Sequence, residues 1–414
     1  MGEEIYMKKI AIFFVAILVL SFLTGCVKKE KEENNNANVI NTEGKIKWLS
    51  YEEGINESGK PYLLFFYSNE TQLKKMENDE IIKLANDFVM IKISSNSINI
   101  SNKYNVSSTP FIIILDKNGN EVVRSFNISS KEIMVEMYNV DVSEKDSILW
   151  MDYESGLEIA NETGKPVLLY FYYSSHRLCQ QTESNLFTNK SVIEKSKSFV
   201  MIKINVGDDK NTNILYKYRF QYIYYTYNNQ IYPYLPTVIF LNESKEILHR
   251  LITYDVYDPN DEKPIEKFLS NMDKALKGKI WGYDFSFVTL DGKTKHLKDY
   301  RGKVVLVDMM ATWCQPCRMQ MAELKKVLQH YGKKKITIIS IDVDEHDDVD
   351  KIKSTFGDHI NEWTFGMDKY KVSYRFWATS IPTLAIFDKY GRLQYLRPGL
   401  TQANELEKII DEIM

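Results

Sequence analysis

A chain of 414 residues is longer than one ordinary hydrophobic core, so we expect several domains. Its content of 44% hydrophobic and 26% charged residues is typical of a globular protein, and its net charge of −3 gives no electrostatic reason for a nucleic-acid partner. The 4 cysteines are too few for a disulfide scaffold, so the position of each has to be explained separately.

The N-terminus has the layout of an export signal. Two lysines precede an apolar run at 10–22, which is short for a membrane-spanning helix. The run is followed by LTGC, which ends at Cys26 and resembles the lipobox of secreted lipoproteins. That resemblance implies a signal peptide at 1–25, lipidation of Cys26 and attachment to the extracytoplasmic face of the cell membrane. The alternative is a plain membrane anchor that ends in a cysteine. Residues 26–44 are polar and charged, which predicts a flexible tether.

Two copies of one pattern follow the tether. Each opens with Trp, Tyr and Gly at the same spacing, continues with Gly-Lys-Pro and an apolar run, and later contains FVMIKI, at 88–93 and 199–204. Each then has an X-Pro pair before another apolar run. Apolar runs that alternate with helix-length polar stretches are typical of an α/β unit. We therefore predict two related α/β domains, at 45–142 and 143–277.

The second copy is longer than the first because it contains a tyrosine-rich segment at 216–234. Tyrosine offers a large contact area at a low cost in side-chain entropy, which suits recognition surfaces. The segment therefore predicts either a surface that binds extended chains or an aromatic hairpin packed on its own domain.

A third, looser copy occupies 278–414. It contains WCQPC, from Trp313 to Cys317, directly after the apolar run VVLVDMM, and later Ile381-Pro382 before another apolar run. A Cys-x-x-Cys pair at the start of a helix can exchange disulfides, because the helix N-terminus stabilises a thiolate and the second thiol can close onto the first.

Alignment of the three copies places other residues at the two cysteine positions of the third. The second copy has His176 and Cys179 there, and the first has Glu70 and Leu73. A lone thiol cannot complete a two-cysteine cycle. Cys179 either packs as a small hydrophobic side chain, which we favour, or forms a mixed disulfide beside His176.

The third copy resembles the TlpA-like, membrane-anchored thiol-disulfide oxidoreductases of the thioredoxin fold. The resemblance rests on WCQPC after a buried strand together with the distant Ile-Pro motif. The first two copies resemble thioredoxin-like domains whose active sites have decayed. The resemblance implies an α/β fold class with three tandem thioredoxin-like domains, each a central mixed β-sheet flanked by helices, of which the third is catalytic.

The resemblance also implies roles for individual residues. Cys314 is the attacking thiol and Cys317 the buried resolving thiol, and the two form the disulfide Cys314–Cys317. Pro382 should be in the cis form, and Ile381 before it offers backbone hydrogen bonds to the substrate. Trp313, Ile381 and Pro382 are the expected substrate-binding residues.

Asp308 is a third catalytic candidate. It lies in a run that is apolar enough to be buried on both faces, where a charge needs a partner or a task. In thioredoxin an acid at this place assists deprotonation of the second cysteine; the alternative here is an exposed aspartate at a strand end. Some TlpA-like proteins carry a glutamate three residues after the second cysteine, and this chain has Gln320 instead.

The acidic run DVDEHDDVD at 342–350 predicts a solvated loop rather than a metal site, because nothing in it sets ligand geometry. WCQPC could also be half of a zinc site, but the chain has no other cysteine pair. We therefore expect no metal and no cofactor.

These patterns favour an extracytoplasmic, lipid-anchored protein-disulfide oxidoreductase. Its partners would be cysteine-containing client proteins outside the cytoplasm and an unidentified redox partner that recharges the dithiol. Two alternatives remain. One is a chaperone-like protein that binds clients through the tyrosine-rich, thioredoxin-like domains. The other is a thioredoxin-fold peroxidase, although a peroxidatic cysteine usually stands alone rather than in WCxxC.

Overall fold

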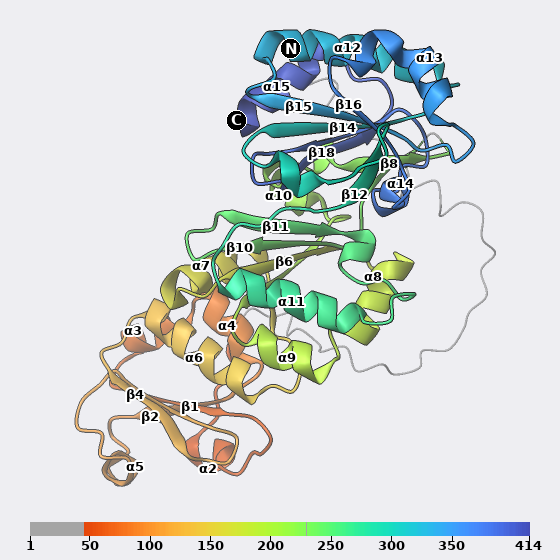
Figure 1. Ribbon diagram of the computed structural model, residues 1–414. Helices are drawn as coiled ribbons and strands as arrows, with labels where there is room; N and C mark the ends of the chain where they lie inside the picture. Colours follow the sequence, from red (N-terminus) through yellow and green to blue (C-terminus); the bar gives the residue numbers. More distant parts are fainter. Residues whose placement is uncertain (1–44, 229) are drawn as a thin grey trace, which may run out of the picture. The chain divides into compact units, whose positions relative to one another are not determined.

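The computed structural model describes residues 45–228 and 230–414. The expected signal peptide, Cys26 and the tether lie outside these ranges. The described chain forms two compact units, one that ends at Ile133 and one that covers Met134–Met414 (Figure 1). Among the described residues, no helix combines the length and the apolar character that a bilayer crossing requires.

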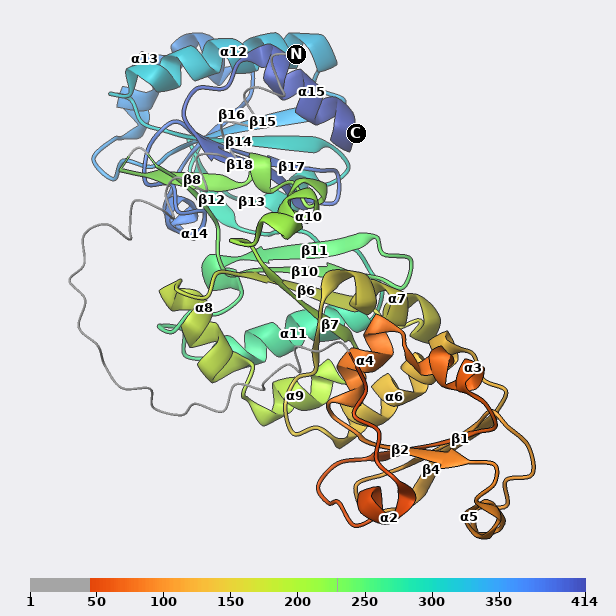
Figure 2. The same ribbon diagram turned by 180° about the vertical axis from the view of Figure 1, so that it is seen from behind.

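The first unit contains a four-stranded mixed sheet with the order β2-β1-β3-β4. β1 pairs in parallel with β2 and antiparallel with β3, and β3 pairs antiparallel with β4. Helix α4 lies on one side of this sheet and α2 and α5 on the other (Figures 1 and 2). The strands are β1 (Tyr62–Tyr67), β2 (Val89–Ser94), β3 (Phe111–Leu115) and β4 (Glu121–Phe126). The helices are α2 (Tyr51–Gly54), α3 (Glu70–Leu73), α4 (Asp79–Ala85), α5 (Ile98–Lys103) and α6 (Ser130–Glu144), the last of which continues into the second unit.

The second unit begins with a five-stranded sheet of order β11-β10-β6-β7-β5 and a separate two-stranded hairpin, β8-β9. The strands are β5 (Trp150–Met151), β6 (Val167–Tyr172), β7 (Val200–Asn205), β8 (Tyr224–Tyr227), β9 (Gln230–Pro233), β10 (Thr237–Leu241) and β11 (Ile247–Ile252). The helices are α7 (Tyr153–Thr163), α8 (Arg177–Gln181), α9 (Lys190–Ser196), α10 (Thr212–Lys217) and α11 (Pro264–Leu276).

The same unit ends with a seven-stranded sheet of order β13-β12-β16-β15-β14-β17-β18. Helices α12, α13 and α15 cover one face of this sheet (Figures 1 and 2). The strands are β12 (Ser286–Thr289), β13 (Thr294–His296), β14 (Val304–Met310), β15 (Ile336–Asp342), β16 (Thr364–Met367), β17 (Thr383–Phe387) and β18 (Leu393–Pro398). The helices are α12 (Gln315–Tyr331), α13 (Val349–Ile360), α14 (Val372–Arg375) and α15 (Ala403–Ile413).

The three large sheets repeat one plan, which is the expected thioredoxin-like arrangement. A buried central strand (β1, β6 or β14) pairs in parallel with the next strand of the repeat and antiparallel with a third strand. That third strand (β3, β10 or β17) follows a cis-proline in every copy, at Pro110, Pro236 and Pro382. The prediction of a cis Ile381–Pro382 bond is therefore confirmed, and each sheet is mixed and flanked by helices as expected.

The shared glycine of the first two copies allows a helix to approach a strand closely. A Cβ atom on Gly156 of α7 would lie 2.5 Å from Ile202 Cγ1, and one on Gly54 of α2 would lie 2.4 Å from Ile91 Cγ1. Any side chain at these positions would collide with a buried isoleucine of the parallel strand.

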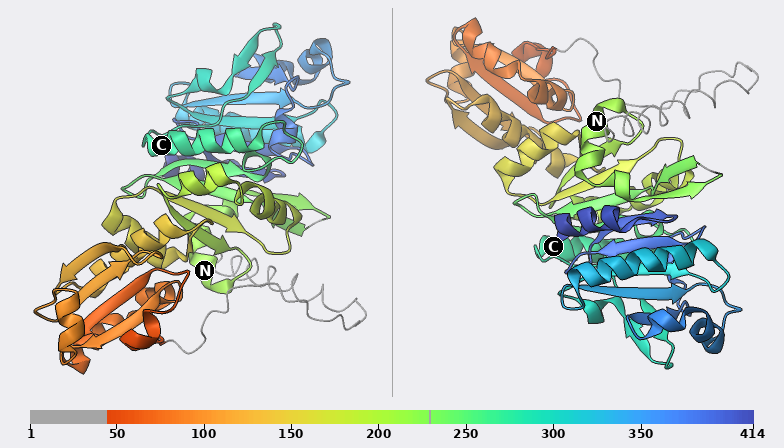
Figure 3. Two further views of the ribbon diagram at one scale, coloured as in Figure 1. Left: turned by 90° about the horizontal axis from the view of Figure 1, so that it is seen from below. Right: turned by 90° about the horizontal axis from the view of Figure 1, so that it is seen from above.

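The tyrosine-rich segment packs on its own domain and also on the third copy, so the alternative of a hairpin packed on its own domain is correct only in part. Ile223 and Tyr234 are buried in one core with Phe376 and Leu396 of the third copy. In both panels of Figure 3 the green part of the chain lies against the blue part. A shared core explains why residues 134–414 form one compact unit.

Candidate functional site

The dithiol lies at the first turn of α12. Cys314 is the N-cap residue, and its Sγ accepts a hydrogen bond from the backbone N–H of Cys317 at 3.2 Å. Pro316 fits the first turn, where backbone N–H groups have no partner within the helix. Cys314 and Cys317 are joined in a disulfide. The helix N-terminus is therefore aimed at the Cys314 sulfur, where it favours negative charge once the disulfide is reduced.

The residues next to the dithiol differ strongly in exposure. Cys317 is fully buried and 2% of Cys314 is exposed, whereas 64% of Trp313 is exposed. Arg318 donates from Nη2 to the carbonyl oxygen of Thr312 at 3.1 Å, which holds a positive charge near the start of the helix. The side chain of Trp313 is therefore the solvent-exposed part of the site.

Asp308 is buried at the middle of the sheet. It lies on β14 between Ser340 of β15 and Leu384 of β17, with no exposed surface. Its Oδ2 accepts a hydrogen bond from Ser340 Oγ at 3.2 Å, and its Oδ1 has no hydrogen-bond partner. Burial raises the pKa of Asp308 to about 7, and the bond from Ser340 opposes that rise. The alternative of an exposed aspartate at a strand end is wrong.

Sequence reasoning did not select the partners of Asp308. Ser340 Oγ accepts a hydrogen bond from Trp363 Nε1 at 3.0 Å and donates to Asp308, so a polar chain crosses the apolar core. The run ITIISI contains two hydroxyls, of which Thr337 is only partly buried and Ser340 is buried. A hydroxyl at a fully buried strand position needs a partner, and that signal could have identified it.

The structure also places the cis-proline loop with the dithiol. Ile381 packs against the hydrophobic cluster that contains both Cys314 and Cys317. Pro382 is buried and directly precedes β17, which pairs with β14. Cys314, Cys317 and Ile381 therefore share one end of the sheet.

The expectation that the acidic run at 342–350 is a solvated loop is wrong in part. Asp342 and Asp347 are each 2% exposed. Asp347 accepts a hydrogen bond from the backbone N–H of Thr312 at 2.9 Å, and Asp344 accepts one from Trp313 Nε1 at 2.6 Å. The loop therefore holds the two residues that precede Cys314. Within 45–228 and 230–414, no group of three potential metal-ligating side chains could hold an ion.

Gln320 has a structural place. It is fully buried on α12, where its Nε2 donates to the carbonyl oxygen of Thr401 at 3.1 Å and its Oε1 accepts from the N–H of Thr401 at 2.7 Å. An amide can make both bonds at once, whereas a carboxylate cannot donate. This pairing explains why glutamine suits the position in this chain.

The corresponding cysteine of the second copy is buried and held in its thiol form. Cys179 Sγ lies 3.6 Å from His176 Nδ1 and has no exposed surface. Burial raises the pKa of Cys179 to about 11, so its thiolate is scarce at neutral pH. This geometry favours packing over exchange at that site.

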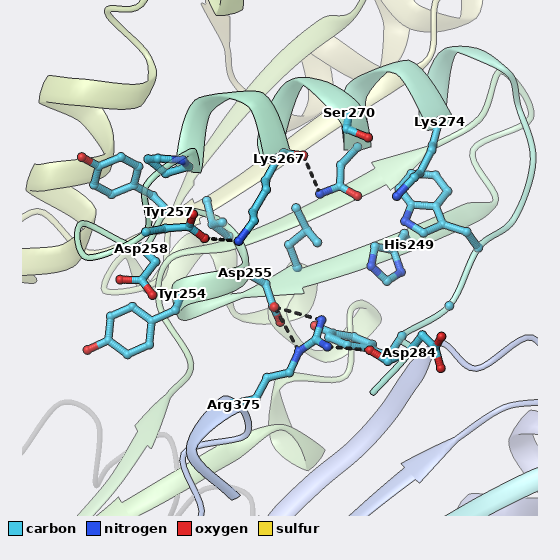
Figure 4. Close-up of a pocket in the computed structure, with 18 of the residues that line it drawn as sticks. His249, Tyr254, Asp255, Tyr257, Asp258, Lys267, Ser270, Lys274, Asp284 and Arg375 are labelled. Atoms are coloured by element: carbon cyan, nitrogen blue, oxygen red, sulfur yellow. Dashed lines mark hydrogen bonds and ion pairs between the residues drawn. The ribbon is translucent and has the colours of Figure 1, made fainter. Parts of the chain in front are cut away.

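A cavity of about 650 Å³ between α11, β11 and α14 is a second concave site (Figure 4). Arg375 forms an ion pair with Asp255 in it, at 3.1 Å. Four basic and four acidic side chains line the cavity, so its charge favours neither an anionic nor a cationic ligand. The basic residues are Lys267, Lys274, Lys371 and Arg375, and the acidic residues are Asp255, Asp258, Asp261 and Asp284. None of the predicted site residues lines it, so the dithiol remains the candidate active site.

Family models match parts of the second and third copies. The family described as AhpC/TSA matches residues 282–396, and the family described as Thioredoxin-like matches residues 149–243. The chain is 32% identical over 130 residues to the thioredoxin-like protein YneN of Bacillus subtilis. The aligned region covers 31% of this chain and 75% of that protein. The chain is 28% identical over 131 residues to the thiol-disulfide oxidoreductase ResA of Bacillus thuringiensis subsp. konkukian, again 31% of this chain and 75% of the relative. A solved structure of MTB dsbF in mixed oxidized and reduced forms matches 31% of this chain and 95% of its own, with 22% identity and a TM-score of 0.29.

Proposed function

We propose that this chain, which belongs to the family of thioredoxin-like thiol-disulfide oxidoreductases, exchanges disulfides with client proteins outside the cytoplasm through Cys314 and Cys317. One observation carries the proposal: a Trp-Cys-x-x-Cys dithiol is closed as a disulfide at the N-terminus of α12. An isolated metal half-site or a structural cysteine would not need that placement.

The reaction consists of two thiol-disulfide exchanges. In the reducing direction the Cys314 thiolate attacks one sulfur of a client disulfide, forms a mixed disulfide and releases the other client sulfur as a thiolate, which takes up a proton. Cys317 then loses its proton and attacks Cys314 Sγ. That step closes the Cys314–Cys317 disulfide and releases the second client thiol. The oxidising direction is the reverse, and a dithiol or disulfide partner restores the starting state.

Asp308 accepts the proton of Cys317 in the second exchange. A buried carboxyl whose pKa is raised to about 7 can take and return a proton near neutral pH. Trp313, Ile381 and Pro382 form the surface on which the client lies, with the backbone of Ile381 as its hydrogen-bonding partner. The exposure of Trp313 supports this assignment.

The protein is anchored to the outer face of the cell membrane through lipidated Cys26, after removal of a signal peptide at 1–25. Residues 26–44 act as the tether, 45–142 and 143–277 as degenerate thioredoxin-like domains that space the catalytic domain or bind clients, and 278–414 as the catalytic domain. The polarity of 26–44 and the apolar run at 10–22 support this organisation.

Two assays test the proposed reaction and its peroxidase alternative. We expect the protein to catalyse reduction of insulin by a dithiol donor and not to consume peroxide at a comparable rate. Cys314→Ser should abolish insulin reduction, whereas Cys179→Ser, a matched change at the buried cysteine, should leave it unchanged. Peroxide consumption that depends on Cys314 without insulin reduction would replace the proposal with a peroxidase.

A further inference from the structure

The tyrosine-rich segment is attached to the sheet of the third copy. Arg219 forms an ion pair with Glu412 at 2.8 Å and donates from Nε to the carbonyl oxygen of Gln394 at 3.2 Å. Ile223 pairs in parallel with Leu396 of β18. The segment therefore continues the seven-stranded sheet past its β18 edge.

The parallel pairing sets the direction in which β8 runs. The end of β18 at Pro398 pairs with Thr383, the residue directly after the cis-proline. A strand parallel to β18 therefore leads toward the dithiol end of the sheet.

Contacts place the hairpin beside the cis-proline loop. Thr379 Oγ1 donates to the carbonyl oxygen of Thr226 at 3.3 Å, and the ring of Tyr225 lies 5.8 Å from that of Trp377. Tyr234 donates from its hydroxyl to the carbonyl oxygen of Phe376 at 2.8 Å. The hairpin thus flanks residues 376–382.

Tyr227 is the last residue of β8. Side chains alternate along a strand, so Tyr227 lies on the same face of β8 as Tyr225, which contacts Trp377. Yet 60% of Tyr227 is exposed, in contrast to buried Tyr234. Its ring therefore extends the surface of the cis-proline loop beyond the point where the two copies touch.

We propose that Tyr227, at the end of β8, forms a client-binding extension of the active site, for an extended polypeptide with aromatic or apolar side chains near its cysteine. This inference rests on the proposed function. A chain that lies along Ile381 reaches Thr379 and then Tyr227, which offers a large contact area at a low entropy cost. The second copy thereby supplies a specificity-determining residue to the dithiol of the third.

The test compares a large and a small disulfide on the same full-length protein. Reduced wild type, Tyr227→Ala and Tyr390→Ala are each mixed with insulin and with 5,5′-dithiobis(2-nitrobenzoic acid), and the rate constants are measured. Tyr390 is the matched control, because it is 42% exposed and lies in the turn between β17 and β18, at the other end of those strands. We expect Tyr227→Ala to slow the reaction with insulin by roughly three- to tenfold, because insulin binds less tightly, and to leave the rate with the small disulfide unchanged.

Disulfide-bonded peptides supply the second readout. Wild type should prefer a peptide with tyrosine or leucine near the cysteine over its serine counterpart, and Tyr227→Ala should lose that preference. Equal rates for Tyr227→Ala and wild type with insulin would overturn the inference. An equal loss of insulin reactivity in Tyr390→Ala would also overturn it. A parallel loss of reactivity with the small disulfide would overturn it as well, because the hairpin would then only stabilise the cis-proline loop. A wild type that reacts with neither disulfide refutes the proposed function itself.

Discussion

Cys314 and Cys317 are separated by one turn of α12, and that turn distinguishes their roles. Cys314 is the N-cap and Cys317 is buried within the helix. We predict that Cys317→Ser traps a mixed disulfide between Cys314 and a client, because the thiol that resolves it is gone. Non-reducing electrophoresis with mass spectrometry of the adduct measures this. If the variant captures no client, and reduced Cys314 alkylates no faster than Cys179, the assignment is wrong.

Asp308 should make the folded protein sensitive to pH. Its pKa is raised to about 7 by burial, compared with about 4 in an unfolded chain. Between these values the folded protein keeps a proton that the unfolded chain has released, so stability falls as the pH rises from about 4 to 7 and stays low above that. Burial also raises the pKa of Asp342 to about 7, so Asp308→Asn should remove only the Asp308 share of this fall and be more stable than wild type at pH 8 by roughly 2–4 kcal/mol. Urea unfolding from pH 4 to 8 measures the difference.

A matched change tests whether the titrating group is Asp308. Ser340→Ala removes the hydrogen bond that opposes the rise of the Asp308 pKa, so the pH-dependent fall in stability should extend to higher pH. Stability curves of wild type and Ser340→Ala that coincide across the range would assign the effect to another group.

Asp308→Asn also tests the catalytic role of Asp308, separately from its effect on stability. If Asp308 accepts the Cys317 proton, Asp308→Asn should slow resolution of the mixed disulfide by roughly tenfold to a hundredfold near neutral pH. The slowing should fade at high pH, where Cys317 ionises unaided. Rapid-mixing experiments on a preformed mixed disulfide follow this step, and a rate ratio that is flat with pH would remove Asp308 from the mechanism.

Gln320 is a residue whose role depends on being neutral. Gln320→Glu keeps the size of the side chain but sets a carboxylate against the carbonyl oxygen of Thr401. We predict a loss of stability of about 1–3 kcal/mol at pH 8, because one buried backbone acceptor loses its donor. The loss should shrink at acidic pH, where the protonated carboxyl can donate. A pH-independent loss measured by thermal unfolding would point to packing instead.

At the scale of elements, α7 depends on its close approach to β7. Gly156→Ala would place a methyl group against Ile202, so we predict a loss of roughly 1–3 kcal/mol from overpacking. Gly357 of α13 is the control, because a Cβ atom there meets nothing within 4 Å. Gly357→Ala should be neutral or gain up to about 1 kcal/mol. Unfolding curves of the two variants in which Gly156→Ala costs nothing would show that α7 can shift away from the sheet.

For the whole molecule, membrane attachment should depend on Cys26. Cys26→Ala would block lipidation and leave either a retained precursor or a released soluble form. Fractionation of cells with detection of the intact chain distinguishes these products from the wild type. A variant that fractionates and migrates like the wild type would favour a plain membrane anchor. Loss of anchoring should leave insulin reduction by the purified protein unchanged, because the dithiol is remote in sequence from Cys26.

The sequence by itself determined the repeated α/β pattern, the strands, WCQPC and the cis-proline position. These features are encoded locally, by runs of apolar residues and by spacings that any copy of the fold must keep. It also identified Asp308 as a candidate, because a charged residue within an apolar run can be recognised from the sequence alone. The tertiary structure decided what lies beside these residues.

Three examples show why those neighbours needed three dimensions. Ser340 is the partner of Asp308 because β15 pairs with β14, and Asp347 contacts Thr312 because its loop folds back. The tyrosine-rich segment has the composition of a surface, yet part of it is buried against the third copy. The residue type determines what a side chain can bind. The long-range pairing of strands determines which groups share a face of the sheet, and that pairing leaves no local signal in the sequence.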